Sequence, residues 1–163
     1  MNLNLTQKER TLLQDQRSHE NICIKKYNNY ANQAQDPELK QMFQTYAGQE
    51  QQHLNTINQM LNGQVPNMQQ NQQGQQNQQG QQNQGQQAGQ NPMGNAMQNA
   101  SDADLCNDML MTEKYVSSAY NTAVFEFVDT NARQALNHIQ KEEQQHGEGI
   151  FNYMKKNGMY QVQ

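Results

Sequence analysis

Hydrophobic residues recur at alternating intervals of three and four positions in two segments of this 163-residue chain, on either side of a middle stretch without such a period. This spacing is typical of amphipathic helices, whose apolar residues share one face. Breaks in the pattern predict four helices, at 7–35, 37–62, 102–128 and 130–157. The chain is therefore predicted to be all-α, with one helical hairpin in each segment.

Residues that favour helix ends stand at the predicted boundaries. A hydroxyl or carboxylate side chain before a helix accepts hydrogen bonds from its first backbone N–H groups, and glycine favours the position after its last turn. The start signals are Thr6 with Glu9, Asp36 before Pro37, Ser101 with Asp104, and Asp129; the end signal is Gly158 after Lys155 and Lys156. These local signals support the four boundaries.

The period also predicts which residues face the interior of a helical bundle. In chain order they are Leu13, Gln16, Glu20, Cys23, Tyr27, Tyr30 and Ala34; Leu39, Phe43, Tyr46, Glu50, His53, Ile57 and Met60; Cys106, Met109, Glu113, Val116, Tyr120, Ala123 and Phe127; and Ala132, Leu136, Ile139, Glu143, His146, Ile150 and Tyr153. Each set is largely apolar, and each has ionisable residues at mid-length. Because an unpartnered buried carboxylate is costly, these ionisable residues need a common explanation.

The middle stretch, 63–100, has no charged residue and consists mostly of Gln, Asn and Gly, with Asn-Gln-Gln-Gly-Gln-Gln at 71–76 repeated at 77–82. Such a composition predicts a disordered linker. Its root-mean-square span of about 31–37 Å approaches the length of one helix, about 39–42 Å. It can therefore return along the bundle, so that the hairpins at 1–62 and 101–163 complete one domain with the second and third helices parallel.

The two hairpins are related by an internal repeat with an offset of 93 residues. Glu20, Tyr27, Asp36, Glu50 and His53 correspond to Glu113, Tyr120, Asp129, Glu143 and His146. The first glutamate lies 16 residues before the turn at Asp36, and Glu50 and His53 lie 14 and 17 residues after it. At about 1.5 Å per residue, all three reach the same height in the hairpin.

The repeat therefore predicts a cluster of six ligands. Glu50-x-x-His53 and Glu143-x-x-His146 each place a carboxylate and an imidazole on one helix face, and Glu20 and Glu113 add a carboxylate from each remaining helix. This is the ligand arrangement of ferritin-like dimetal bundles. Carboxylate and imidazole suit iron or manganese, so we predict two iron or manganese ions. Which glutamates bridge the ions is left open.

Other candidate residues lie near this cluster or apart from it. Tyr27 and Tyr120 are two turns beyond a ligand glutamate, so they either hydrogen-bond to ligand carboxylates or simply pack in the core. The isolated Cys23 and Cys106 form no Cys-x-x-Cys pair and are interpreted as core residues. His19 and His138 lie off the inward faces and are predicted at the surface: they are not candidate ligands.

Charge and hydropathy exclude two classes of partner. The net charge is −4, the sequence pI is about 5.5, and no basic run exceeds two residues, which argues against nucleic-acid binding. No apolar stretch approaches the length of a membrane-spanning helix, and the first ten residues do not resemble a signal peptide. We therefore expect synthesis and folding in the cytoplasm.

The ligand pattern resembles that of the rubrerythrin and bacterioferritin branch of the ferritin-like superfamily, across both hairpins. That resemblance implies a four-helix bundle with a dinuclear centre. Two departures bear on function: the chain encodes no rubredoxin-type iron site, and Val116 stands where rubrerythrins carry a further glutamate. An electron-relay peroxidase of the full rubrerythrin type is therefore not expected.

The second hairpin also resembles the coat F family of bacterial spore coat proteins. The similar segments are Asp104-Leu105-Cys106-Asn107-Asp108-Met109-Leu110, Tyr120-Asn121-Thr122-Ala123 and the ending Tyr153-Met154-Lys155-Lys156-Asn157-Gly158-Met159-Tyr160. The resemblance implies a structural component of the spore coat, with other coat proteins and copies of itself as partners. The alternative is a catalytic dimetal centre that reduces peroxide or oxygen. Both interpretations stay open at this point.

Overall fold

A computed structural model describes residues 2–64, 66 and 100–161. These residues form four α-helices and no β-strand: α1 (Gln7–Gln33), α2 (Pro37–Leu61), α4 (Asp102–Val124) and α5 (Thr130–Lys156). All four helices belong to one compact unit. For these described residues, the prediction of an all-α fold with four helices is confirmed. None of these helices combines the length and the apolar character needed to cross a membrane.

The helices begin at the predicted capping residues. At the start of α1, the Thr6 backbone N–H donates to the Glu9 carboxylate (2.7 Å) and the Glu9 N–H donates back to the Thr6 hydroxyl (3.2 Å). Ser101 and Asp104 exchange the same pair of bonds at α4. The carboxylates of Asp36 and Asp129 cap α2 and α5. Each cap provides acceptors for N–H groups that have no partner inside the helix.

All four helices end earlier than predicted, two of them by a single residue and two by more, at Gln33 instead of 35 and at Val124 instead of 128. Carboxylates from distant parts of the chain bind the backbone that follows each of the latter two ends. The Glu9 carboxylate accepts from the Val128 N–H (2.9 Å), and Asp102 accepts from the N–H groups of Gln35 and Asp36 (both 2.9 Å). These side chains satisfy donors that would otherwise need a helical carbonyl.

The last helix ends at glycine, as predicted, and so does α2. Gly158 and Gly63 have φ angles of 68° and 78°, in the left-handed region that glycine occupies without strain. The next residue in each case donates its backbone N–H to a carbonyl five residues back, Met159 to Met154 (2.8 Å) and Gln64 to Gln59 (2.9 Å). This is the Schellman arrangement that closes helices.

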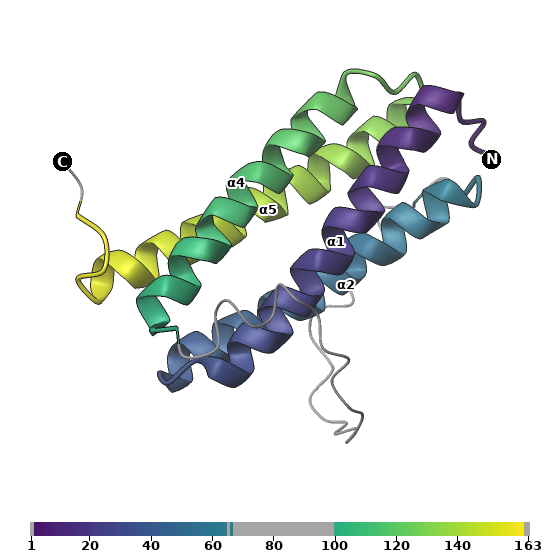
Figure 1. Ribbon diagram of the computed structural model, residues 1–163. Helices are drawn as coiled ribbons and strands as arrows, with labels where there is room; N and C mark the ends of the chain where they lie inside the picture. Colours follow the sequence, from purple (N-terminus) through teal and green to yellow (C-terminus); the bar gives the residue numbers. More distant parts are fainter. Residues whose placement is uncertain (1, 65, 67–99, 162–163) are drawn as a thin grey trace. The chain divides into compact units, whose positions relative to one another are not determined.

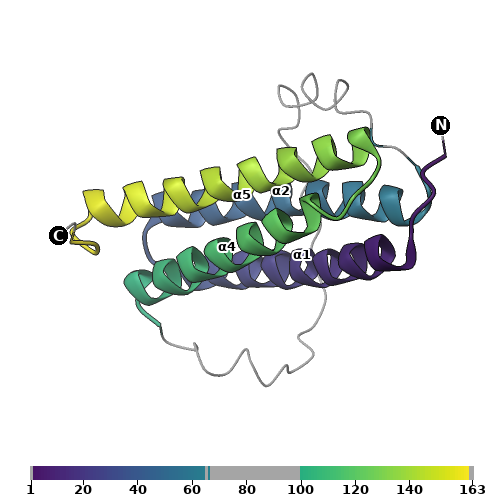
Figure 2. The same cartoon turned by 90° about the horizontal axis from the view of Figure 1, so that it is seen from above.

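The helices pack as two antiparallel hairpins, with α1 against α2 and α4, and α5 against α4 and α2 (Figure 1). Helices α2 and α4 run in the same direction (Figure 2). The end of α2 lies beside the start of the chain, where the Leu3 N–H donates to the Gly63 carbonyl (2.7 Å). Helix α4 starts at the opposite end, where Asp102 binds the α1–α2 turn. Apart from its ends, the predicted linker 63–100 lies outside the described residues.

The interior of the bundle is formed by the predicted inward faces. Every residue of the four predicted sets is buried, apart from Tyr46, which is half-buried. Both cysteines are buried and free, in agreement with their interpretation as core residues. His19 and His138 are half-buried and lie outside the interior sets. At mid-length the apolar core is interrupted by the ionisable residues considered next.

Candidate metal centre

Six ionisable side chains lie at the middle of the bundle, contributed by all four helices. They are Glu20 from α1, Glu50 and His53 from α2, Glu113 from α4, and Glu143 and His146 from α5. Each is at most 2% exposed. The steps of three and four residues that bury the apolar side chains also direct these six inward, because they share the same helix faces.

The six side chains form two overlapping groups, each with ligand atoms within 4.8 Å of one another. One group contains Glu20, Glu50, His53 and Glu143, and the other contains Glu50, Glu113, Glu143 and His146. Two carboxylates, Glu50 and Glu143, are common to both groups. These two shared carboxylates are therefore the candidates for contacting two ions. Glu20 and Glu113 each belong to one group only and could contact one ion each.

Both imidazoles direct Nδ1 toward the shared carboxylates. The Nδ1 atom of His53 lies 3.0 Å from Oε1 of Glu143 and 3.3 Å from Oε2 of Glu50. The Nδ1 atom of His146 lies 3.0 Å from Oε1 of Glu50. The two rings are stacked, with centroids 5.9 Å apart. Each imidazole therefore offers one nitrogen to the cluster and leaves Nε2 for an outer partner.

The outer partners of the two histidines differ in charge. Nε2 of His53 lies 2.8 Å from the Glu142 carboxylate, and Nε2 of His146 lies 2.8 Å from the side-chain carbonyl of Gln49. Gln49 and Glu142 occupy equivalent positions in the internal repeat. Sequence reasoning missed both, although each immediately precedes a predicted ligand glutamate. It named Tyr46 only as an inward-facing residue and did not predict that its ring stacks on His146, 4.3 Å between centroids.

The two tyrosines named from the sequence connect the hairpins. The phenol of Tyr27 on α1 donates to Glu113 on α4, and the phenol of Tyr120 on α4 donates to Glu20 on α1. Burial and the neighbouring carboxylates raise the pKa of both phenols well above the usual value, so they stay protonated donors. Each tyrosine thus orients a carboxylate contributed by the other hairpin.

Burial divides the carboxyl groups into two kinds. It raises the pKa of Glu20 and Glu113 well above the usual value. Burial and mutual repulsion act on Glu50 and Glu143 as well, but hydrogen bonds from the two imidazoles outweigh them and lower the pKa of both. Without metal, Glu20 and Glu113 therefore keep their protons to higher pH than Glu50 and Glu143 do.

The histidines balance the two carboxylates. Burial alone would lower the pKa of each imidazole, but the surrounding carboxylates outweigh it, raising the pKa of His146 to about 12 and that of His53 well above the usual value. In the metal-free cluster, the imidazoles thus hold protons that face the carboxylates of Glu50 and Glu143. Metal ions would replace the protons of these groups.

The residues fit a pair of divalent cations. Among the described side chains, one carboxylate oxygen of each of Glu20, Glu113 and Glu143 is buried without a hydrogen-bond partner. Such an oxygen is costly to bury unless a cation or a donor contacts it. Carboxylate oxygens with imidazole nitrogens form a donor set that suits iron and manganese.

Glu142→Gln is expected to weaken binding of one of the two ions by about tenfold, because a carboxylate that accepts from a ligand imidazole raises its basicity and fixes its orientation. The change gives His53 an amide partner, as His146 already has. Calorimetric titration of the metal-free protein with Mn²⁺ would measure it. Gln49→Glu is the reciprocal control and should strengthen one site. Equal affinities in Glu142→Gln and the unmodified protein would contradict the role of Glu142.

Comparison with known protein families finds a match to the second hairpin. Residues 101–163 match the Coat F domain, a segment that contains α4, α5 and three of the six clustered residues. The uncharacterized protein YusN of Bacillus subtilis (strain 168) is 35% identical over 63 residues, which are 39% of this chain and 57% of that protein. The chain thus spans little more than half the length of this curated relative.

Proposed function

We propose that this chain is a spore-coat-associated protein of the ferritin-like type, in which one helical bundle holds two iron or manganese ions. The observation that carries the proposal is the convergence of six buried Glu and His side chains in one cluster, three of which lie in the segment that matches the Coat F domain. The Coat F match supports the spore-coat role. The parallel course of α2 and α4 and the ligand pattern support the ferritin-like assignment.

In the proposed centre, Glu50 and Glu143 would be shared by the two ions, Glu20 and His53 would help to hold one, and Glu113 and His146 would help to hold the other. Tyr27 and Tyr120 keep the terminal carboxylates in place through their hydrogen bonds. Bound metal would supply Lewis acidity and one-electron redox chemistry. Burial of the six side chains strengthens the electrostatic contacts within the cluster.

Fractionation of spores from the native source would test the proposal. The protein is expected in the coat extract, and the purified protein is expected to contain about two iron or manganese ions per chain by elemental analysis. Recovery only from the spore interior or from vegetative cells would refute the coat assignment. Metal-free protein that cannot be loaded by either ion would refute the metal centre.

A second candidate is a dimetal oxidoreductase that reduces peroxide or oxygen. It is favoured by a surface cleft between α4 and α5 whose lining includes Glu113 and Glu143. Peroxide consumption by manganese-loaded or iron-loaded protein would test this role, with the Glu50→Ala variant as the control for unbound metal. A rate equal to that of the control would exclude it.

We propose that 63–100 tethers the two hairpins into one domain. Tethering depends on length, so replacing 63–100 with a Gly/Ser segment of equal length is expected to leave helix content and metal stoichiometry unchanged. Circular dichroism and elemental analysis would measure both. A loss of either would contradict a purely tethering role.

The same replacement separates tethering from assembly. Side-chain amides favour association between chains, so a role of the glutamines in coat contacts predicts that the replaced protein is missing from the insoluble coat. Equal incorporation of the two proteins would exclude that role.

A further inference from the structure

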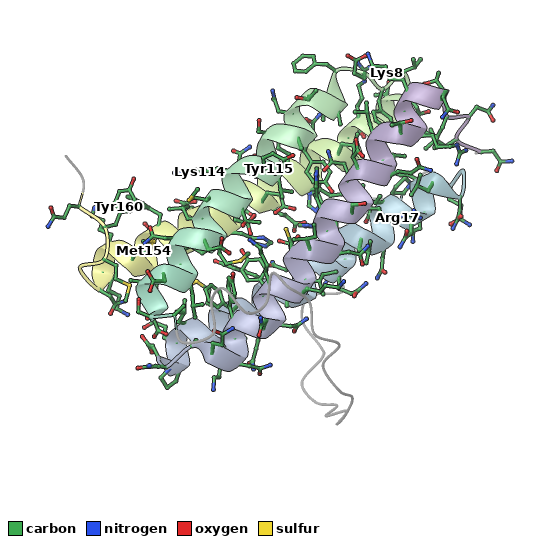
Figure 3. All side chains as sticks on the ribbon, in the orientation of Figure 1. Lys8, Arg17, Lys114, Tyr115, Met154 and Tyr160 are labelled. Atoms are coloured by element: carbon green, nitrogen blue, oxygen red, sulfur yellow. The ribbon has the colours of Figure 1, made fainter. Side chains whose placement is uncertain are left out.

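A cleft of about 700 Å³ lies between α4 and α5, and its lining includes two of the clustered glutamates, Glu113 and Glu143. Lys114 and Tyr160, which also line it, lie on α4 and beyond the end of α5 (Figure 3). Its size is within the range of small-molecule sites in proteins. Two residues of the proposed metal centre thus form part of the wall of the cleft, while their carboxylates stay buried.

The cleft depends on a glycine inside α5. A Cβ atom at Gly147 would lie 3.8 Å from both Cβ of Glu113 and Cδ1 of Leu110, an ordinary contact distance. Glycine lowers helix stability relative to alanine, and the φ angle of Gly147 is not in the left-handed region that would require it. The backbone therefore does not explain this glycine, whereas a larger side chain would extend into the cleft.

The internal repeat provides a comparison within the same molecule. At the offset of 93 residues, Gly147 corresponds to Leu54, and Ser117, another lining residue, corresponds to Ile24. Leu54 and Ile24 are both half-buried in the first hairpin. The first hairpin thus has branched apolar side chains at the two positions where the second has a glycine and a small hydroxyl. The access that these small residues provide belongs to the second hairpin.

The lining of the cleft combines apolar, uncharged polar and charged groups, the last being Lys114 and Glu148 beside the two clustered glutamates. Leu110, Phe151 and Tyr160 supply apolar surface, and the Phe151 and Tyr160 rings pack edge to face, 5.0 Å between centroids. The hydroxyl of Ser117 and the amides of Gln140 and Gln144 supply hydrogen-bonding groups. This lining suits a small organic molecule with an apolar body and a polar end.

We infer that the α4–α5 cleft binds a small organic oxygen-donor ligand and brings it to the metal position of Glu113 and His146, and that Gly147 keeps this path open. The inference rests on the proposed metal centre. Glu20 and His53 belong to the first hairpin, where Leu54 and Ile24 stand at the positions equivalent to Gly147 and Ser117. The two ions therefore differ in access to external ligands.

Cobalt-loaded protein, titrated with acetohydroxamate and followed by the visible absorption of Co²⁺, tests the inference. Acetohydroxamate is expected to bind the unmodified protein and Gly147→Ala with affinities that agree within about twofold, and Gly147→Leu and Ser117→Ile at least about tenfold more weakly. Gly48→Leu is the matched control, since a Cβ at the exposed Gly48 on α2 meets no atom within 4 Å. It should bind like the unmodified protein.

Cobalt content separates this inference from the proposal on which it rests. Failure of the unmodified protein to bind cobalt would refute the metal centre and the inference with it. Two cobalt ions per chain with undiminished acetohydroxamate affinity in Gly147→Leu and Ser117→Ile would refute the cleft alone. Loss of cobalt from both variants would show that Gly147 and Ser117 hold the metal-binding side chains in place and do not control access to the metal. That result would also overturn the inference.

Discussion

Glu50→Ala is expected to reduce metal content from about two ions per chain to below about one, whereas Glu113→Ala and His146→Ala are expected to retain about one. The difference follows from the two overlapping groups. Glu50 belongs to both, so its loss removes a ligand from each ion, while Glu113 and His146 belong to one group only. Elemental analysis after dialysis against a metal concentration that saturates the unmodified protein would measure it.

Two controls make this experiment specific. Glu38→Ala removes an exposed carboxylate at the start of α2 that pairs with Lys156 at the surface, and it should retain both ions. Glu50→Gln keeps the shape of the side chain and removes only its charge, so it distinguishes ligand loss from a packing defect. Retention of two ions by both Glu50→Ala and His146→Ala would show that the cluster is not the binding site.

Most of the fold follows from local features of the sequence. The capping pairs Thr6–Glu9 and Ser101–Asp104 act within three residues, so the helix starts can be predicted without knowledge of the fold. The end of α4 cannot, because the Val128 N–H binds the Glu9 carboxylate 119 positions away. Periodicity alone would continue the helix, and only the packing of α1 against this turn provides the alternative acceptor.

The candidate site follows from the sequence only in part. The internal repeat and the helical period are enough to name the six clustered residues and the two tyrosines, since all eight lie on inward faces. Gln49 and Glu142 lie one position off those faces, and they contact the imidazoles only because both rings direct Nδ1 inward and Nε2 outward. That orientation, like the sharing of Glu50 and Glu143, is a property of the packed bundle.

Stability of the metal-free protein is expected to fall as pH rises from about 5 to 8. The folded-state pKa values of Glu20 and Glu113 are raised above the usual 4.5, and those of His53 and His146 above the usual 6.5. Over this interval the folded chain holds protons that the unfolded chain releases. Stability decreases with pH wherever the unfolded state binds fewer protons. Thermal melts in the presence of a chelator would measure the trend.

The metal-loaded protein is expected to show the opposite trend, because protons compete with the ions for the same carboxylates and imidazoles. Ligand excess of about a thousandfold over Kd corresponds to about 4 kcal/mol, so a chelator should lower Tm at pH 8 on the order of 10 °C. At pH 5, where metal is released, it should have little effect. A Tm at pH 8 that is unchanged by chelator would contradict a loaded site.

The double variant Glu20→Gln/Glu113→Gln separates the contribution of the two carboxyl groups to this pH dependence from that of the two histidines. Its amides are permanently uncharged and resemble the protonated acids of the metal-free cluster, so they remove the stability loss caused by deprotonating those two groups. Without metal, its Tm should therefore fall less between pH 5 and 8 than that of the unmodified protein. Bound metal should raise the Tm of the variant less than that of the unmodified protein, because each ion loses its terminal carboxylate. If the variant without metal followed the unmodified protein at every pH, the protons would not reside on Glu20 and Glu113, and the two histidines alone would account for the trend.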